Sequence, residues 1–175
     1  MEPAVVGINS NVIPKLHATQ VRALQRINEE DFTLPMQVVK RGSPQYGDEY
    51  IQGGFAALRQ YYKALVLDPL NPHALSPEVD EFAHAHLLPT KAYDEFCKDV
   101  YGCRLFHQPL DHADDEAVTR MSKCYRYTTD TALPLLFDFV DAKFWPQHPN
   151  RKLVCNDDFV HNRFGDMAVL PKVQH

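Results

Sequence analysis

The chain has 175 residues, a formal net charge of −5 and 45% hydrophobic residues. This length predicts one domain, and the hydrophobic share is sufficient for a folded core rather than a disordered chain. The excess of acidic side chains argues against nucleic acid and anionic membranes as partners, because both are bound by clustered Lys and Arg. We therefore expect protein partners, and neither nucleic acid nor a membrane.

The sequence also predicts a cytoplasmic location. No apolar run approaches the ~20 residues that a membrane-spanning helix needs. The N-terminal stretch MEPAVVGINSNVIPKL lacks the basic start and apolar core of a secretory signal. No two cysteines form a CxxC pair, so we expect buried free thiols rather than a zinc knuckle; the cysteines are Cys97, Cys103, Cys124 and Cys155.

Two helices separated by a long loop are predicted in the first part of the chain. An apolar face predicts a helix over 13–29, formed by Ile13, Leu16, Leu24 and Ile27. The Pro and Gly residues within 31–49 interrupt regular structure and predict a loop. A period of three and four residues predicts a helix over 48–67. Gly53 and Gly54 should weaken the first half of that helix.

Two short helices and an exit loop are predicted next. Ser76-Pro77-Glu78 has the cap, the proline and the acid that start a helix, which should run to Leu88 before Pro89 interrupts it. Thr90 begins a second helix that Gly102 ends, and a loop follows over 103–111.

The last third is predicted to hold one clear helix and one short one. Asp114-Asp115-Glu116 places acids at the start of a helix, where they favour the helix dipole. Residues 133–146 predict a short helix. The tail has no strong period, although 153–154 and 167–170 are apolar enough to dock on the body. We expect flexible ends at 1–10 and 150–175.

Together these elements predict an all-α fold. The expected architecture is a single helical domain over 1–175, an irregular bundle of about five to six helices around the hairpin 79–107.

Three of the nine histidines gather in this hairpin, namely His84, His86 and His107. Neutral imidazole is a common ligand of zinc and iron, and three protein ligands leave a coordination position open for chemistry. Asp80 precedes His84 by four residues, so both lie on one helical face. Asp80 is therefore expected to orient His84 or to act as a ligand itself.

Helical geometry restricts this site. His84 and His86 are two residues apart and point in nearly opposite directions on a regular helix. One metal can take both only if the helix is distorted near Pro89. A smaller site would use Asp80, His84 and His107, with His86 elsewhere. Without a metal, His84 would be a catalytic base oriented by Asp80, or the histidines would be structural, tying helices together by hydrogen bonds.

Residues 55–145 resemble a known family. The resemblance rests on a Tyr-rich helix, an Asp-Glu…His-x-His segment and a Tyr-bearing helix start, followed by a His-x-Pro segment and a Trp-Pro pair. These are FAALRQYYKALVL (55–67), DEFAHAHLL (80–88), PTKAY (89–93), Phe106-His107-Gln108-Pro109 and Trp145-Pro146. The stretch resembles the glycine-rich domain-containing protein-like family, a helical group of largely undefined biochemistry. The chain departs from the family's tryptophan, aspartate and first paired histidine at Ala83, Pro89 and Phe106, which implies a divergent member.

Two functions fit these observations. The first is a non-catalytic interaction or adaptor protein with a protein partner, in which the histidines are mainly structural. The alternative is a metal-dependent hydrolase or oxygenase, using zinc or iron at His84, His86 and His107 with support from Asp80. An enzyme requires the imidazoles to converge on one point, whereas an adaptor requires an exposed apolar patch. Cys97 lies in an apolar helical stripe and is expected in the core.

Overall fold

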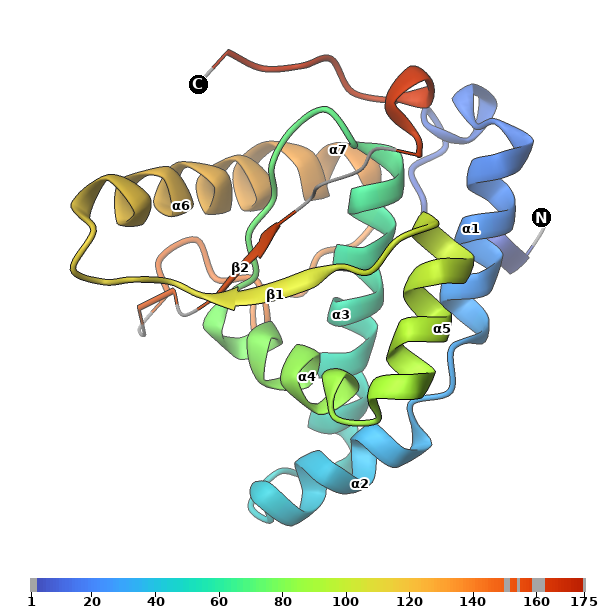
Figure 1. The fold of residues 1–175 in the computed structure, drawn as a ribbon. Coiled ribbons are helices and arrows are strands. Elements are labelled where there is room, and N and C mark those ends of the chain that lie inside the picture. The colour runs from blue at the N-terminus through green and yellow to red at the C-terminus, as the bar shows by residue number, and fades with distance from the viewer. Residues whose placement is uncertain (1–2, 150–151, 154, 159–162, 175) are drawn as a thin grey trace.

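The protein is mostly helical, which confirms the all-α prediction (Figure 1). The computed structural model describes residues 3–149, 152–153, 155–158 and 163–174. Within these ranges, none of the helices is long and apolar enough to span a bilayer. Six described helices have ten residues or more: α1 (Ala18–Glu29), α2 (Thr33–Gly42), α3 (Asp48–Leu67), α4 (Pro77–Leu87), α5 (Thr90–Tyr101) and α6 (Asp115–Tyr127).

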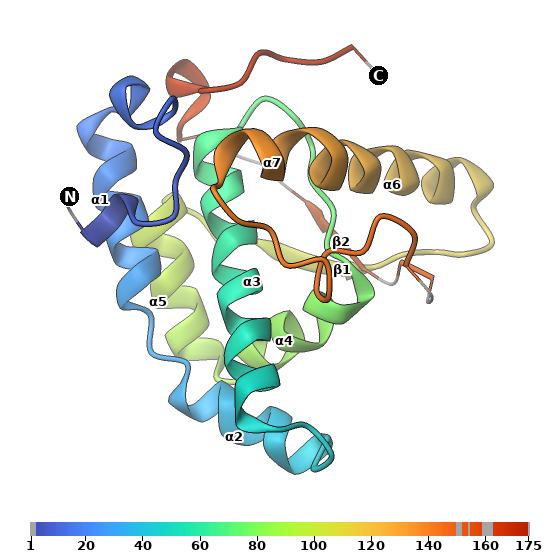
Figure 2. The ribbon, with the colours of Figure 1, turned by 180° about the vertical axis from the view of Figure 1, so that it is seen from behind.

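Helix α3 passes through the middle of the molecule, with α1, α4 and α7 (Leu133–Leu136) packed against it (Figures 1 and 2). Its 20 residues match the predicted range 48–67. The predicted apolar stripe is buried, from Ile51 and Phe55 to Leu58, Tyr62 and Leu65. The helices that pack against α3 contact it along this stripe.

The paired glycines do not interrupt α3, contrary to the weakening that the sequence suggested. A Cβ atom added at Gly54 would overlap the ring of Phe82 on α4, and one at Gly53 would lie 2.8 Å from Cε2 of Phe144. Phe82 is fully buried and contacts Phe55 edge to face, with ring centroids 5.1 Å apart. Gly54 therefore lets α4 approach α3 closely, and Gly53 makes room for the ring of Phe144.

The predicted loop over 31–49 is wrong for its first half, which forms α2. Pro35 lies in the first turn of this helix, where its missing N–H costs no hydrogen bond. Gly42 is the last helical residue, a position that glycine tolerates well. Two side chains of α2, Pro35 and Val39, are buried. The proline and the glycine thus mark the two ends of a helix.

The helix predicted over 13–29 begins later, at Ala18. Residues Ile13–Lys15 form a single 3₁₀ turn, and Leu16 is extended. A capping box then starts α1, in which the backbone N–H of His17 donates to Oε1 of Gln20 at 3.0 Å.

The predicted loop 103–111 contains the strand β1 (Phe106–Pro109). It pairs antiparallel with β2 (Cys155–Asp158), so that His107 lies opposite Asp157 in the register. The predicted helix over 133–146 is confined to α7, which follows a π-helical turn at Thr128–Ala132. The sequence indicated neither of these two strands.

The described parts of both ends contact the body, and the flexibility expected at 1–10 and 150–175 stays a prediction. Ile8 is buried, and the N–H of Asn9 donates to the carbonyl of Leu136 at 2.9 Å. The N–H of Val169 donates to the carbonyl of Leu67 at 2.9 Å, in line with the predicted docking of 167–170. The remaining terminal positions in these predictions, 1–2, 150–151, 154, 159–162 and 175, lie outside the described residues.

We expect Gly54→Ala to lower the free energy of unfolding by about 1–3 kcal/mol, because its Cβ would force the buried Phe82 ring to move. Alanine's better helix propensity would offset only part of this cost. Urea denaturation monitored by circular dichroism measures the change. Gly42→Ala is the matched control, since a Cβ at Gly42 meets no atom within 4 Å. Equal stability of the two variants would contradict the close packing of α3 against α4.

Candidate metal centre

The start of α4 is set by the predicted cap. The Oγ of Ser76 accepts a hydrogen bond from the N–H of Val79 at 3.0 Å, and its hydroxyl donates to the carbonyl of Phe144 at 2.5 Å. Pro77 is the first helical residue. This cap is fully buried and determines where along α4 each later side chain emerges.

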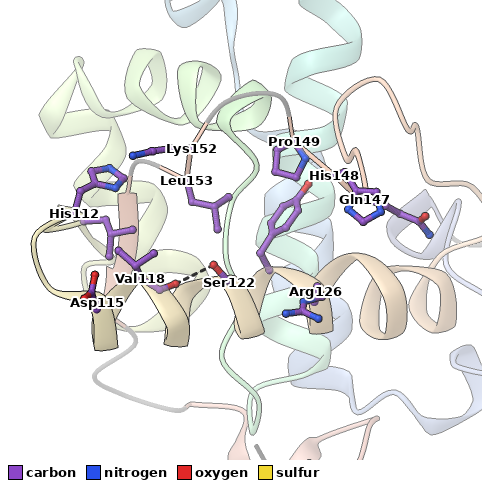
Figure 3. Close-up of a pocket in the computed structure, with 12 residues that line it drawn as sticks. His112, Asp115, Val118, Ser122, Arg126, Gln147, His148, Pro149, Lys152 and Leu153 are labelled. Atoms are coloured by element: carbon purple, nitrogen blue, oxygen red, sulfur yellow. Dashed lines mark hydrogen bonds between the residues drawn. The ribbon is translucent and has the colours of Figure 1, made fainter.

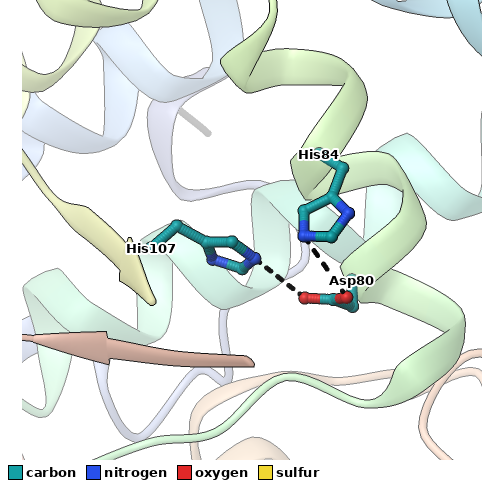
Figure 4. Close-up of side chains that lie close together, drawn as sticks. All are labelled: Asp80, His84 and His107. Carbon is teal, nitrogen blue, oxygen red and sulfur yellow. Dashed lines mark ion pairs between the residues drawn. The ribbon is translucent and has the colours of Figure 1, made fainter. Parts of the chain in front are cut away.

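Asp80 on α4 lies between two imidazoles (Figure 4). Its Oδ1 is 2.9 Å from Nε2 of His107 on β1, and its Oδ2 is 3.6 Å from Nε2 of His84 on α4. The two rings are nearly perpendicular, with centroids 4.8 Å apart. One donor atom from each of the three residues lies within 4.8 Å of the other two. The structure therefore brings together the smaller of the two sites that the sequence allowed.

The three side chains of this group differ in their exposure to solvent. The side chains of Asp80 and His107 are 8% and 7% exposed, whereas that of His84 is 52% exposed. Among the described residues, no donor reaches Oδ1 of Asp80 with hydrogen-bond geometry. The close ion pair with Nε2 of His107 is one physical explanation for this buried carboxylate oxygen, and a bound cation would be another.

The donor set suits a transition metal. Two imidazole nitrogens and one carboxylate oxygen are ligands that zinc and iron(II) accept, at bond lengths of about 2.0–2.2 Å. Donors bound to one such ion lie at most about 4.2 Å apart, which is twice the bond length. The separations of 2.9 Å and 3.6 Å from Asp80 to the two imidazoles fall within this limit. The two imidazoles offer nitrogens within 4.8 Å of each other, so they would have to move slightly closer if that separation exceeds the limit. The exposed His84 side leaves room for further ligands.

His86 does not join this group, so the predicted site of three histidines is not assembled. Its ring is 1% exposed and points to the other side of α4. Its Nδ1 lies 2.8 Å from the hydroxyl of Tyr62, and its Nε2 lies 3.0 Å from Oε1 of Glu30. Because α4 stays regular to Leu87, residues two apart face opposite ways. His86 is a structural histidine of the core.

Glu30 anchors this second cluster. Its other oxygen, Oε2, accepts a hydrogen bond from Arg26 at 2.6 Å, and the carboxylate is largely buried. Burial by itself raises the pKa of Glu30, but the hydrogen bonds and charges of His86 and Arg26 outweigh burial and lower that pKa. Sequence reasoning missed Glu30, because it is 56 positions from His86 and follows no recognisable motif.

Cys97 has the inert environment that the sequence predicted. It is fully buried in α5, and burial raises the pKa of its thiol to about 11. A thiol held in this protonated form is a poor nucleophile.

One of two hollows in the described part of the chain reaches the site, and the other does not. A groove of about 440 Å³ between α2 and α4 reaches His84 and is lined by Val38, Val39, Gly42, Ser43, Glu81, Ala85, Leu87 and Leu88. A cavity of about 550 Å³ along α6 shares no lining residue with the metal group (Figure 3). His112 and His148 line this second cavity.

No known protein family, curated protein or solved structure matches this chain. The resemblance to the glycine-rich domain-containing protein-like family therefore remains a prediction from the sequence, and the chemistry must be argued from the side chains themselves.

We expect Glu30→Gln to destabilise the protein by about 1–3 kcal/mol at neutral pH, since it weakens buried hydrogen bonds to His86 and Arg26. The wild-type protein should lose stability as pH falls below the ordinary glutamate pKa of about 4.3, because protonation of Glu30 cancels its favourable interactions. The variant should lose less over that interval. Urea midpoints between pH 3 and pH 7 measure both effects.

The exposed neighbour Glu29 supplies the control for this pH series. Glu29→Gln should retain the wild-type acid dependence, because the Glu29 carboxylate lies outside the His86 cluster. Parallel pH profiles for wild type and Glu30→Gln would contradict the assigned role of Glu30.

Proposed function

We propose that this protein binds one zinc ion through Asp80, His84 and His107 and hydrolyses a small substrate there. The single observation that carries the proposal is the convergence of these three side chains, with a buried Asp80 oxygen directed at an imidazole nitrogen. An enzyme was expected to bring all three imidazoles to one point, and His86 does not join the group. The partial convergence, of His84 and His107 around Asp80, is what supports the proposal. It favours the metal-dependent alternative over the structural role for His84 and His107.

The role of each residue in the proposed site would depend on how deeply its side chain is buried. Asp80 and His107, both nearly inaccessible, would hold the ion from the protein side. His84 stands at the solvent edge and also lines the groove between α2 and α4, so a substrate would approach past it. A bound zinc ion supplies a Lewis acid and lowers the pKa of a water molecule. The apolar groove wall would hold the uncharged part of a substrate.

A second candidate is an iron(II)-dependent oxygenase. Its support is the donor set itself, because two histidines and one carboxylate on one side of the ion are typical of non-haem iron(II) enzymes.

The adaptor role has less support, which comes from two exposed apolar side chains near the group, Leu88 at 64% and Phe106 at 50%. A cytoplasmic location with a protein partner remains part of that proposal.

The purified full-length protein is expected to bind one equivalent of zinc or iron, measured by inductively coupled plasma mass spectrometry and by calorimetric titration. Asp80→Asn and His107→Ala should each weaken binding by roughly 100-fold, since each removes a ligand or its charge. Ester hydrolysis with zinc and oxygen consumption with iron(II) then distinguish the two enzymes.

His112→Ala is the matched control, because His112 is exposed and lies outside the group. It should bind metal as the wild type does. Circular dichroism must show that the Asp80 and His107 variants stay folded. If the wild type takes up none of zinc, iron or manganese, the metalloenzyme proposal fails and partner capture becomes the next experiment.

A further inference from the structure

A third hollow, a cavity of about 410 Å³, is lined by residues of α3 and of the chain after α7. Figure 2 shows this part of the chain running alongside α3. The cavity shares no lining residue with the metal group. The amide of Gln60 on α3 donates to the carbonyl of Phe139 at 2.6 Å and holds the two walls together. Most of the lining is apolar or small, from Val6, Gly7, Gly53, Ala56, Ala57, Phe137 and Phe139.

One amine faces this cavity. Lys63 on α3 is half-buried and lines it. Asp138 and Asp141 also line the cavity, but no ion pair joins Lys63 to a carboxylate of the described residues. A charged neighbour that contributes to the electrostatic environment of Lys63 is Arg59, one helical turn earlier.

Arg59 is held in place beside Lys63. Its guanidinium donates to the carbonyl of Glu30 at 2.7 Å and to that of Ile27 at 3.3 Å, and it lies 4.4 Å from the centroid of the Phe32 ring. Because these contacts fix the guanidinium, its positive charge is a permanent feature of the wall. A half-buried amine next to a fixed cation is the arrangement that activates nucleophilic lysines.

Burial, and then the charge of Arg59, lower the pKa of Lys63 to about 8. At pH 7.4 about a fifth of this amine is neutral, against about a thousandth of an exposed lysine with a pKa near 10.4. The lower basicity reduces the intrinsic nucleophilicity of the amine, so only part of this gain in free amine becomes a gain in rate.

We propose that Lys63 is a carbonyl-reactive amine that forms a Schiff base with a small apolar aldehyde or ketone in this cavity. The neutral Nζ attacks the carbonyl carbon, and the carbonyl oxygen takes up a proton to give a carbinolamine. Loss of that hydroxyl as water forms the C=N bond, so amine and carbonyl are converted to imine and water without an oxidant or a reductant. This site is independent of the proposed metal centre.

The test is competitive reductive alkylation of the full-length protein with propanal and cyanoborohydride, which reduces the imine to a stable secondary amine. Peptide mass spectrometry follows each lysine over time between pH 6 and pH 10. At pH 7, Lys63 should be modified roughly tenfold faster than the exposed Lys15 and Lys91, with a rate that levels off above about pH 8.

Two variants test whether the fast modification occurs at Lys63 within this cavity, rather than reflecting only the exposure of a lysine to solvent. Lys63→Met should lose the fast-reacting site while Lys15 and Lys91 keep their rates. Ala56→Phe, at the exposed edge of the cavity, should slow propanal modification of Lys63 at least threefold and leave the other lysines unchanged. If Lys63 reacts no faster than the exposed lysines, or if Ala56→Phe leaves its rate unchanged, the proposal is overturned.

Discussion

The contact between α3 and α4 determines most of what this protein can do. Gly54 lets the Phe82 ring lie directly on the α3 backbone, and Ser76 caps α4 against the chain near Phe144. Because its start and its packing face are both fixed, α4 can adopt only one rotation about its own helix axis. That rotation sends Asp80 and His84 toward β1 and His86 into the core. Two histidines separated by a single alanine therefore occupy opposite chemical environments.

These environments complement each other. On the inner side, Tyr62 and Glu30 are the hydrogen-bond partners of His86, and Arg26 in turn pairs with Glu30. This buried network makes the core specific without giving it access to solvent. On the outer side, Asp80 is equally buried, but its neighbours are imidazoles of which one reaches solvent. The proposed metal binding rests on this buried carboxylate and the two imidazoles beside it. The same helix thus contributes both to stability and to the proposed chemistry.

The sequence predicted features that depend on local chemistry. Ser76 and Pro77 located the start of α4, Gly102 located the end of α5, and the four-residue spacing from Asp80 to His84 placed both on one face. The errors arose where distant residues decide the outcome. Proline and glycine in 31–49 suggested a loop, whereas burial of Val39 against the body favours helix α2. Neither Glu30 beside His86 nor the cavity that encloses Lys63 follows a pattern along the chain.

The strand β1 has a consequence for how the protein is made. His107 reaches Asp80 from a strand whose hydrogen-bonded neighbour, β2, begins at Cys155. Pairing of this kind joins segments about fifty residues apart, and contacts over such separations form late in folding. A ribosome that has released the chain from α3 to β1 has released Asp80 and both histidines, but not β2, the strand that pairs with β1. The group of Asp80, His84 and His107 would then be completed only when the C-terminal part of the chain has emerged. The helices of the nascent chain would therefore fold before the proposed metal site is assembled.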